Sequence, residues 1–188
     1  MRIIAGKFKG SSLYLPKNSN TRPLKDVARE SIFNLLTHSN KISFQLKRSN
    51  VLDLFAGTGS FGLECLSRSA KNVCFVEKEK IAFEILEKNI KKLNLKNESK
   101  TYLNDVYSFI KKEKIKFNFD LIFLDPPFKN TDTNNLIDLI FYSNLLMKNG
   151  IIVLHRNKNN KEALPDYFKI IEERTYGMSK IIFGKLLA

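Results

Sequence analysis

The feature that most constrains this sequence is a regular alternation of short apolar stretches with amphipathic ones, which runs from residue 51 almost to the end of the chain. Stretches typical of buried strands occupy residues 51–55, 72–77, 101–105, 119–128 and 151–155. Apolar residues at helical spacing lie between them, at residues 61–67, 79–93, 106–113 and 133–147. Strands that alternate with helices form a mainly parallel sheet with helices on both faces. The sequence therefore predicts an α/β fold.

The two ends of the chain depart from this alternation. Residues 1–22 are typical of a short basic β-hairpin or arm with a turn at residues 10–12, and a helix is expected from about residue 21 to residue 39. Polar residues 47–50 mark a boundary, so we expect two parts, a basic N-terminal arm and helix at 1–46 and a main domain at 47–188. The chain closes with two predicted strands joined by a turn at Gly177, namely residues 167–175 and 179–187.

Charge is spread unevenly along the chain, whose formal net charge is +13. Residues 1–50 hold ten Lys and Arg residues against two acidic residues, which gives a net charge of +8 there and +5 for residues 51–188. A basic segment attached to a more balanced body favours a polyanionic partner. A solvated, lysine-rich surface is the alternative interpretation, because the chain favours Lys, Asn and Ile throughout.

Composition excludes several classes of protein. Hydrophobic residues make up 43% of the chain, which is enough for a sizeable core. No apolar stretch approaches the ~18 residues that a membrane span needs, and the first residues lack the apolar core of a signal peptide. Cys65 and Cys74 are too few for a disulfide framework or a zinc site. We therefore expect a cytoplasmic protein with two reduced, structural thiols.

A glycine-rich turn follows the first predicted strand and opens the next helix. It reads DLFAGTGSFG from Asp53, and Glu77 ends the following strand, where a carboxylate can bind ribose hydroxyls. Glycines let the backbone turn sharply and approach a ligand closely. The spacing Gly57-x-Gly59-x-x-Gly62 also fits a dinucleotide motif. Asp53 favours a ligand with a cationic head, such as the amino acid part of S-adenosylmethionine, whereas a buried aspartate that caps nearby amides is the alternative.

Asn104, Asp105 and Val106 come at the end of the third predicted strand. An acceptor at this place can take the amino group of an adenine, and the backbone amide that follows can donate to the ring. Asp105 is equally suited to cap the N-terminus of the next helix. The sequence leaves these two interpretations open.

The most specific motif is Asp125-Pro126-Pro127-Phe128, directly after the apolar stretch LIFL. Two prolines fix φ twice and remove two amide donors, so the loop is rigid. The Asp125 carboxylate and the Pro126 carbonyl are acceptors for the two N–H groups of a nucleobase amine, and Phe128 is suited to stack on a base that has been splayed out of its helix. An ordinary end of a strand explains the prolines, but it does not explain the flanking acid and aromatic residue.

Other chemistries find little support. His38 and His155 are isolated in the sequence, without metal-ligand spacing, and are interpreted as surface or structural residues. The chain has no G-x-S-x-G nucleophile motif and no G-x-x-x-x-G-K-[ST] phosphate loop. We expect neither a metal nor a covalent intermediate.

Taken together, the motifs resemble those of class I S-adenosylmethionine-dependent methyltransferases. The N-terminal RIIAGKFKGSSL and RPLKDVARESIFNLL, followed by DLFAGTGSFGLECLSR, VEKE, DPPF and a late YG, are similar to the bacterial 16S rRNA (guanine(966)-N(2))-methyltransferase family over nearly the whole chain. The resemblance implies a Rossmann-like sheet of seven strands in the order 3-2-1-4-5-7-6. It also implies N2-methylation of one guanine in 16S rRNA of the small ribosomal subunit, by a protein expected to be a monomer.

The resemblance and the motifs give three sets of candidate residues. The residues expected to orient the base are Asp125, Pro126, Pro127 and Phe128. The residues expected to bind S-adenosyl-L-methionine are Asp53, Phe55, Gly57, Gly59, Glu77, Asp105 and Val106. The residues expected to bind RNA through the basic extension are Arg2, Lys7, Lys9, Arg22, Lys25 and Arg29.

Three other functions compete with this one. A DNA adenine-N6 methyltransferase uses similar loops, but it carries a sizeable target-recognition region, and only about fifty residues lie outside the predicted core. A nicotinamide oxidoreductase shares the fold, but it has no use for DPPF and needs a proton donor such as Tyr-x-x-x-Lys. A non-catalytic RNA-binding assembly factor would not need both an intact glycine turn and DPPF.

Overall fold

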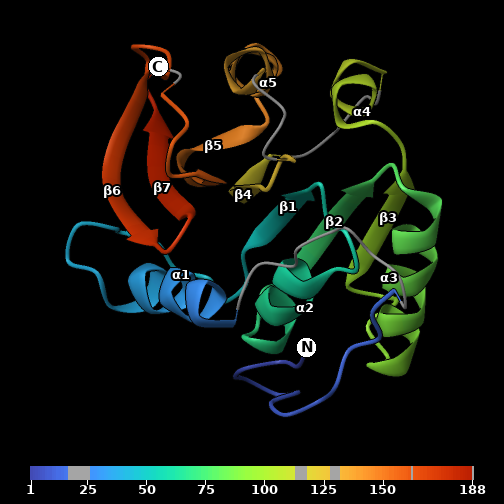
Figure 1. Ribbon diagram of the computed structural model, residues 1–188. Helices are drawn as coiled ribbons and strands as arrows, with labels where there is room; N and C mark the ends of the chain where they lie inside the picture. Colours follow the sequence, from blue (N-terminus) through green and yellow to red (C-terminus); the bar gives the residue numbers. More distant parts are fainter. Residues whose placement is uncertain (17–25, 113–117, 128–131, 162, 188) are drawn as a thin grey trace.

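A seven-stranded sheet with helices on both faces forms the body of the protein (Figure 1). The computed structural model describes residues 1–16, 26–112, 118–127, 132–161 and 163–187. The helices are α1 (Asp26–His38), α2 (Ser60–Ser67), α3 (Lys80–Lys92), α4 (Val106–Lys112) and α5 (Thr133–Tyr142). The strands are β1 (Asn50–Leu54), β2 (Asn72–Glu77), β3 (Ser99–Leu103), β4 (Phe119–Leu124), β5 (Leu146–Asn157), β6 (Phe168–Tyr176) and β7 (Ser179–Leu186).

The strand order is β3-β2-β1-β4-β5-β7-β6, which confirms the predicted order. The first five strands in this order pair in parallel, whereas β7 runs antiparallel to both β5 and β6. The strand order reverses between β1 and β4, because β2 and β3 lie on one side of β1 and β4 and β5 lie on the other. Ligands of open parallel sheets bind at such a switch point, outside the carboxyl ends of the strands.

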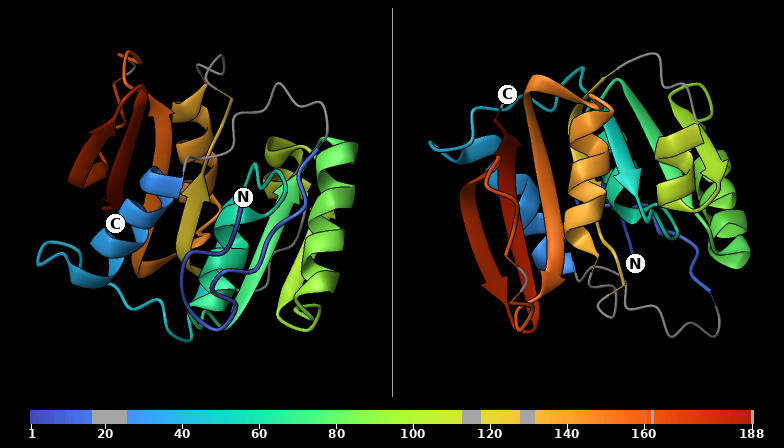
Figure 2. Two further views of the ribbon diagram at one scale, coloured as in Figure 1. Left: turned by 60° about the horizontal axis from the view of Figure 1, so that its bottom comes forward. Right: turned by 90° about the horizontal axis from the view of Figure 1, so that it is seen from above.

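Successive residues of the central strands point to opposite faces of the sheet, as the strand period of two requires. Val51, Phe123 and Val153 pack on the side of α1, α2 and α3, while Leu52 and Leu124 pack on the side of α4 and α5. Figure 2 shows these two helical layers from the two sides of the sheet. Because both faces are covered, the central strands consist almost entirely of apolar residues.

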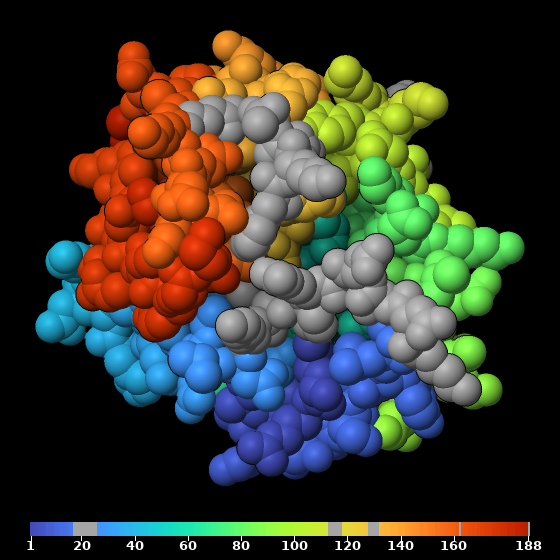
Figure 3. Space-filling model, viewed as in Figure 1, coloured from blue at the N-terminus to red at the C-terminus, as the bar shows by residue number. Residues whose placement is uncertain are grey.

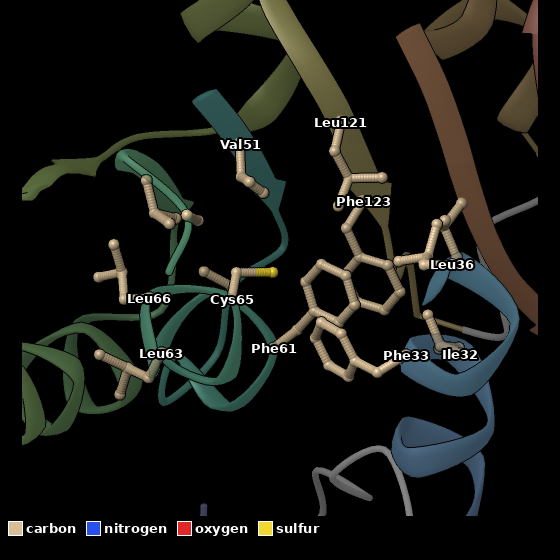
Figure 4. Close-up of a cluster of buried hydrophobic side chains, with 14 of the residues drawn as sticks. Ile32, Phe33, Leu36, Val51, Phe61, Leu63, Cys65, Leu66, Leu121 and Phe123 are labelled. Atoms are coloured by element: carbon tan, nitrogen blue, oxygen red, sulfur yellow. The ribbon is translucent and has the colours of Figure 1, made fainter. Parts of the chain in front are cut away.

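Three stacked aromatic rings join α1 to the sheet (Figure 4). The ring of Phe61 in α2 lies 3.9 Å from that of Phe123 in β4 and 5.1 Å from that of Phe33 in α1, measured between centroids. All three side chains are buried. Helix α1, which precedes the predicted boundary at residue 47, therefore packs into the same core as the main domain.

Residues 1–16 form an arm along α2 and α3 that pairs with itself only briefly, where the sequence leaves a β-hairpin or an arm open. Only one antiparallel bridge, between Arg2 and Ser12, is present in this part of the described chain, and the turn spans residues 5–10 instead of 10–12. The arm bonds to itself, for example through the amide of Ile3 to the carbonyl of Ser11 and the amide of Leu13 to that of Met1, both at 3.0 Å, and it also bonds to helix α2. Buried Glu64 accepts the amide hydrogens of Ile4 and Ala5, at 2.7 and 3.0 Å.

The helix predicted at residues 133–147 is shorter than expected. It ends at Tyr142, and Asn144 takes a positive φ of 50°, which stops the helix, so that β5 already begins at Leu146. Of the apolar residues after position 142, Leu146 and Met147 belong to this strand and Leu145 directly precedes it. The predicted turn at Gly177 between the last two strands is confirmed, with a φ of 59°. The predicted start of α1 near residue 21 lies outside the described residues.

Phe61→Ala is expected to lower the free energy of unfolding by about 3–5 kcal/mol, since it empties the middle position of the aromatic stack. Tyr142→Ala is the matched control, because this side chain is 76% exposed and its loss should cost no more than about 0.5 kcal/mol. Urea unfolding followed by circular dichroism measures both. Equal midpoints for Phe61→Ala and the wild type would contradict the role of the stack.

Candidate functional site

The candidate site lies at the carboxyl ends of β1, β2 and β4, where the glycine turn (residues 55–59) follows β1. Phe55, Gly57 and Gly59 all adopt positive φ, of 64°, 56° and 85°. A positive φ is strained for a bulky residue such as Phe55, and such strain concentrates at ligand sites. The turn is held by the amide of Ala56, which donates to the carbonyl of Val76 in β2.

Two glycines of this segment are required by packing. A Cβ on Gly59 would lie 2.4 Å from Leu86 of α3, and a Cβ on Gly62 would lie 2.3 Å from the ring of Phe75 in β2. Gly57 is different, because a Cβ there would meet no atom within 4 Å. Gly57 is therefore required for its backbone conformation, on the open side of the turn.

Asp53 is a buried carboxyl group at the end of β1, with 1% of its surface exposed. Its Oδ2 accepts the amide hydrogen of Gly62 in the first turn of α2, at 3.0 Å, so the capping interpretation describes its observed contact. The pKa of Asp53 is raised to about 8, chiefly by burial and in part by the charges of Asp125 and Glu77, against the lowering effect of the Gly62 amide. A nearby cation would stabilise the ionised form of this buried carboxyl group.

Glu77 joins the end of β2 to the glycine turn. Its Oε2 accepts the amide hydrogen of Gly57 and its Oε1 that of Glu79, both at 2.7 Å. The spacing of about twenty residues therefore does bring this carboxylate to the glycine turn. An ionised carboxylate has about four acceptor positions, so these two bonds leave capacity for hydroxyl groups of a ligand.

Asp105 and Val106 follow the end of β3, at the same edge of the sheet. The Oδ1 of Asp105 accepts the amide hydrogen of Ser108 at 3.1 Å, so Asp105 caps α4. Val106 is buried beneath the first turn of that helix. The structure thus shows the capping contact, while adenine binding by these two residues remains a prediction.

Asp125 begins the acid–proline corner (residues 125–127) at the end of β4, directly beside the glycine turn. Leu124 pairs with Leu54, the last residue of β1, and the amide of Asp125 lies 3.5 Å from the carbonyl oxygen of Leu54. Pro126 is buried and Pro127 is exposed. The glycine turn and the acid–proline corner therefore lie side by side. Phe128, the last residue of the predicted motif, lies outside the described residues.

Figure 3 shows a hollow near the centre of the face that it presents, in which the teal surface of the segment after residue 50 is visible.

His155, which the sequence interprets as a surface or structural residue, is buried beside the acid–proline corner. Its Nδ1 lies 2.7 Å from Oδ1 of Asp125, across the adjacent strands β4 and β5. The pairing of Leu124 with Leu154 brings the next residue of each strand together. The signal in the sequence is a polar residue directly after the apolar run of residues 151–154.

The basic residues of the N-terminal extension differ in their exposure. The side chains of Arg2, Lys7 and Lys9 are exposed, whereas Arg22 and Lys25 lie outside the described residues. Arg29 is wrong as an RNA-binding candidate in this structure, because it is fully buried in α1. Its guanidinium donates to the carbonyl of Arg2 at 2.6 Å and to Asp26 at 2.9 Å, and so it fixes the arm.

One buried side chain connects the arm to the glycine turn. The Oδ1 of Asn89 in α3 accepts the amide hydrogen of Tyr14 at 2.8 Å, and its Nδ2 donates to the carbonyl oxygens of Tyr14 and Thr58 at 3.2 and 3.0 Å. Asn89 is fully buried. The arm and the turn are therefore held by the same amide group.

Metal clusters and membrane spans are both absent from the described residues. These contain no group of three His, Cys, Asp or Glu residues that could hold a metal ion. No helix among them is long and apolar enough to cross a membrane. Cys65 and Cys74 are both buried, and they form no disulfide with each other.

Comparison with known proteins places the chain in a family. Residues 1–185 match the family described as "Conserved hypothetical protein 95". The chain belongs to this family. Ribosomal RNA small subunit methyltransferase D of Haemophilus influenzae is 34% identical over 179 residues, covering 95% of this chain and 90% of that protein. The protein of the same name from Escherichia coli K12 is 28% identical over 178 residues, covering 94% and 85%. The family resemblance noted in the sequence is thereby confirmed.

Solved structures agree with this placement. The protein yhhF of Escherichia coli has a TM-score of 0.85 at 25% identity, and HI0767 of Haemophilus influenzae has one of 0.80 at 31% identity; each covers 100% of this chain and 98% of its own. SMU.776, solved with S-adenosylhomocysteine, shares the fold at 17% identity, with a TM-score of 0.62 over 81% of this chain and 49% of its own. The predicted Rossmann-like class I methyltransferase fold is confirmed.

Asp53→Asn is expected to change how stability depends on pH. The folded-state pKa of Asp53 is raised to about 8, so the native protein holds a proton that the unfolded chain, with a pKa of about 3.9, has released. The free energy of unfolding therefore falls as pH rises from about 4 to about 8, by up to about 1.4 kcal/mol per pH unit from this group, and changes no further above that.

Urea unfolding between pH 5 and pH 9 measures this dependence. The stability of Asp53→Asn relative to the wild type should rise toward pH 8 and then level off. Asp166→Asn removes an exposed carboxylate and serves as the control, for which the difference should stay flat. A flat difference for Asp53→Asn as well would contradict the raised pKa.

Proposed function

We propose that this protein transfers the methyl group of S-adenosyl-L-methionine to N2 of a guanine in 16S rRNA of the small ribosomal subunit. The observation that carries the proposal is the position of Asp125 at the carboxyl end of β4, next to the glycine turn of β1. That arrangement presents an acceptor for an amine beside a turn suited to a nucleoside. The names of the relatives that cover most of the chain support an rRNA substrate.

The donor set at the switch point suits S-adenosylmethionine. Asp53 and Glu77 place two carboxyl groups at the glycine turn, where one suits the cationic amino acid part and the other the ribose hydroxyls. Phe55, Gly57 and Gly59 shape the turn against the ligand, and Asp105 with Val106 would border the adenine. When bound, the cofactor supplies a sulfonium that gives up its methyl group to a nucleophile.

The acid–proline corner would prepare the nucleophile. The exocyclic nitrogen of guanine is a poor nucleophile because its lone pair is conjugated with the ring. Hydrogen bonds from its two N–H groups to the Asp125 carboxylate and the Pro126 carbonyl favour a pyramidal nitrogen with its lone pair free. In the transfer this nitrogen would take the methyl group, the neutral thioether would leave, and the nitrogen would pass one N–H proton to solvent. Catalysis of this kind rests on alignment and on the electrostatic environment.

The N-terminal arm would hold the RNA. Arg2, Lys7 and Lys9 are exposed on an arm that is bonded to α2 and α3, so their charges occupy defined places relative to the site. Arg22 and Lys25 join this set on the basis of the sequence. Contacts between such residues and phosphates supply affinity without sequence specificity. We further propose that the protein acts in the cytoplasm, as a monomer and without a metal.

Asp125→Ala is expected to abolish methyl transfer while cofactor binding stays within about threefold of the wild type. The reason is that the carboxylate contacts the base, and loss of such a group lowers kcat on the order of 100-fold or more. The measurement is transfer of labelled methyl groups to small subunits from cells that lack this protein, followed by mapping of the modified base. Binding of S-adenosylhomocysteine is measured by calorimetry.

The control is Asp166→Ala, which removes an exposed carboxylate outside the site and should leave kcat unchanged. Equal losses of cofactor binding and of turnover in Asp125→Ala would contradict the assigned role. A modified base other than guanine, or a modified nitrogen other than N2, would overturn the proposed substrate. Competition between RNA and DNA in the same assay tests the DNA adenine alternative.

The double variant Lys7→Gln, Lys9→Gln is expected to weaken RNA binding and to flatten its salt dependence, by about 0.7 in the log–log slope for each phosphate that the arm no longer neutralises. The variant Lys169→Gln, Lys185→Gln removes the same charge from the β6–β7 hairpin and should change neither quantity as much. Filter binding at several salt concentrations measures both. An identical effect of the two double variants would show that only net charge matters.

A further inference from the structure

We infer that His155 is a positioning residue for methyl transfer, because its imidazole holds the Asp125 carboxylate in the orientation that the target amine needs. The inference deepens the proposed function and rests on it. The sequence singles out Asp125, but the orientation of its side chain depends on a residue thirty positions further along the chain. His155 has no role in the site that the sequence predicts.

The contact between His155 and Asp125 fixes the orientation of the carboxylate. The Nδ1 of His155 lies 2.7 Å from Oδ1 of Asp125, the short distance expected when one partner of a hydrogen bond is charged. The His155 side chain is 6% exposed, whereas the Asp125 side chain is 24% exposed. The imidazole therefore stands behind the carboxylate, which alone of the two faces the open edge of the sheet.

The prolines of the corner make this bond important. Pro126 and Pro127 have no amide hydrogen, so neither of these two residues can donate a backbone hydrogen bond to the Asp125 carboxylate. Among the residues that the structure describes, His155 is the hydrogen-bond donor to Asp125. Without it the carboxylate would rotate about two side-chain bonds at an exposed edge.

The bond also divides the two oxygens of Asp125 between two tasks. An ionised carboxylate only accepts, so the imidazole must carry its proton on Nδ1 in order to donate to Oδ1. Oδ2 is then the oxygen that is presented to the N–H of a target base. A carboxylate fixed at one oxygen offers the other in one direction, which is the precision that alignment of the amine requires.

A donor at this place also offsets an unfavourable neighbour. Asp53 is the residue before the last of β1 and Asp125 follows the last residue of the adjacent strand β4, and the charge of Asp125 contributes to the raised pKa of Asp53. Two carboxyl groups so close disfavour each other's ionised form. The hydrogen bond from His155 to Oδ1 offsets part of this repulsion at the Asp125 carboxyl group.

The test compares His155→Leu, which removes the donor, with His155→Asn, whose side-chain amide can place an N–H near the position of Nδ1. Steady-state methyl transfer to small subunits that lack the modification gives kcat and KM. We expect His155→Leu to lower kcat at least tenfold with KM for the cofactor within twofold, and His155→Asn to recover most of kcat. An unchanged kcat for His155→Leu, or an equal loss in the two variants, would overturn the inference.

A double-mutant cycle with Asp125→Asn shows whether His155 acts through Asp125. If it does, adding His155→Leu to Asp125→Asn lowers kcat by less than twofold further, because the carboxylate to be held is already gone. If the two losses multiply, His155 acts independently and the inference is overturned. Thermal unfolding of each variant identifies a loss of folding, and His155→Asn keeps the question answerable if His155→Leu does not fold.

A measurement without substrate separates this inference from the proposed function. Nitrogen-15 NMR of the histidine rings should show a protected Nδ1–H for His155 in the wild type, and this signal should be lost in Asp125→Ala. Absence of the signal in the wild type overturns the pairing whatever the enzyme methylates. Conversely, a mapped product other than N2-methylguanine overturns the proposed function while the ring signal stands.

Discussion

The pairing of β4 directly beside β1 is the constraint on which the site depends. It places Leu124 opposite Leu54, so that the glycine turn after one strand and the acid–proline corner after the other open at one edge. Neither motif suffices alone, because the glycine turn is suited to a nucleoside and the acid–proline corner to the amine beside it. The apolar faces of these strands maintain the pairing, because α2 covers one face and α5 the other.

Carboxyl groups determine the electrostatics of this edge. Asp53, Glu77 and Asp125 converge there within a protein whose formal net charge is +13. Backbone amides and one imidazole donate to them, and Asp53 is left with a pKa of about 8. An acidic centre inside a basic protein suits two ligands of different kinds, because a polyanion is attracted to the exterior while a cationic group is stabilised within.

Much of this arrangement can be predicted from the sequence, because the carboxyl ends of parallel strands meet at one edge and the motifs follow such strands. The errors have local causes. Arg29 is predicted to bind RNA because the composition of a segment does not show which of its side chains are buried. In the structure Arg29 lies on the buried face of α1. The helix expected at 133–147 is too long, because Leu145 and Leu146 continue the helical spacing past Asn144. The bond of His155 to Asp125 depends on strand register, which no local pattern contains.

The amide of Asn89 bonds to Tyr14 of the arm and to Thr58 of the glycine turn. Two segments that share one buried anchor are not independent. A change that displaces the anchor leaves polar groups of both without partners at once, and each such group costs about 1–3 kcal/mol. Evolution can therefore alter the exposed residues of the arm freely. The residues that bind the arm to Asn89 of α3 can change only together with the glycine turn, which Asn89 also binds.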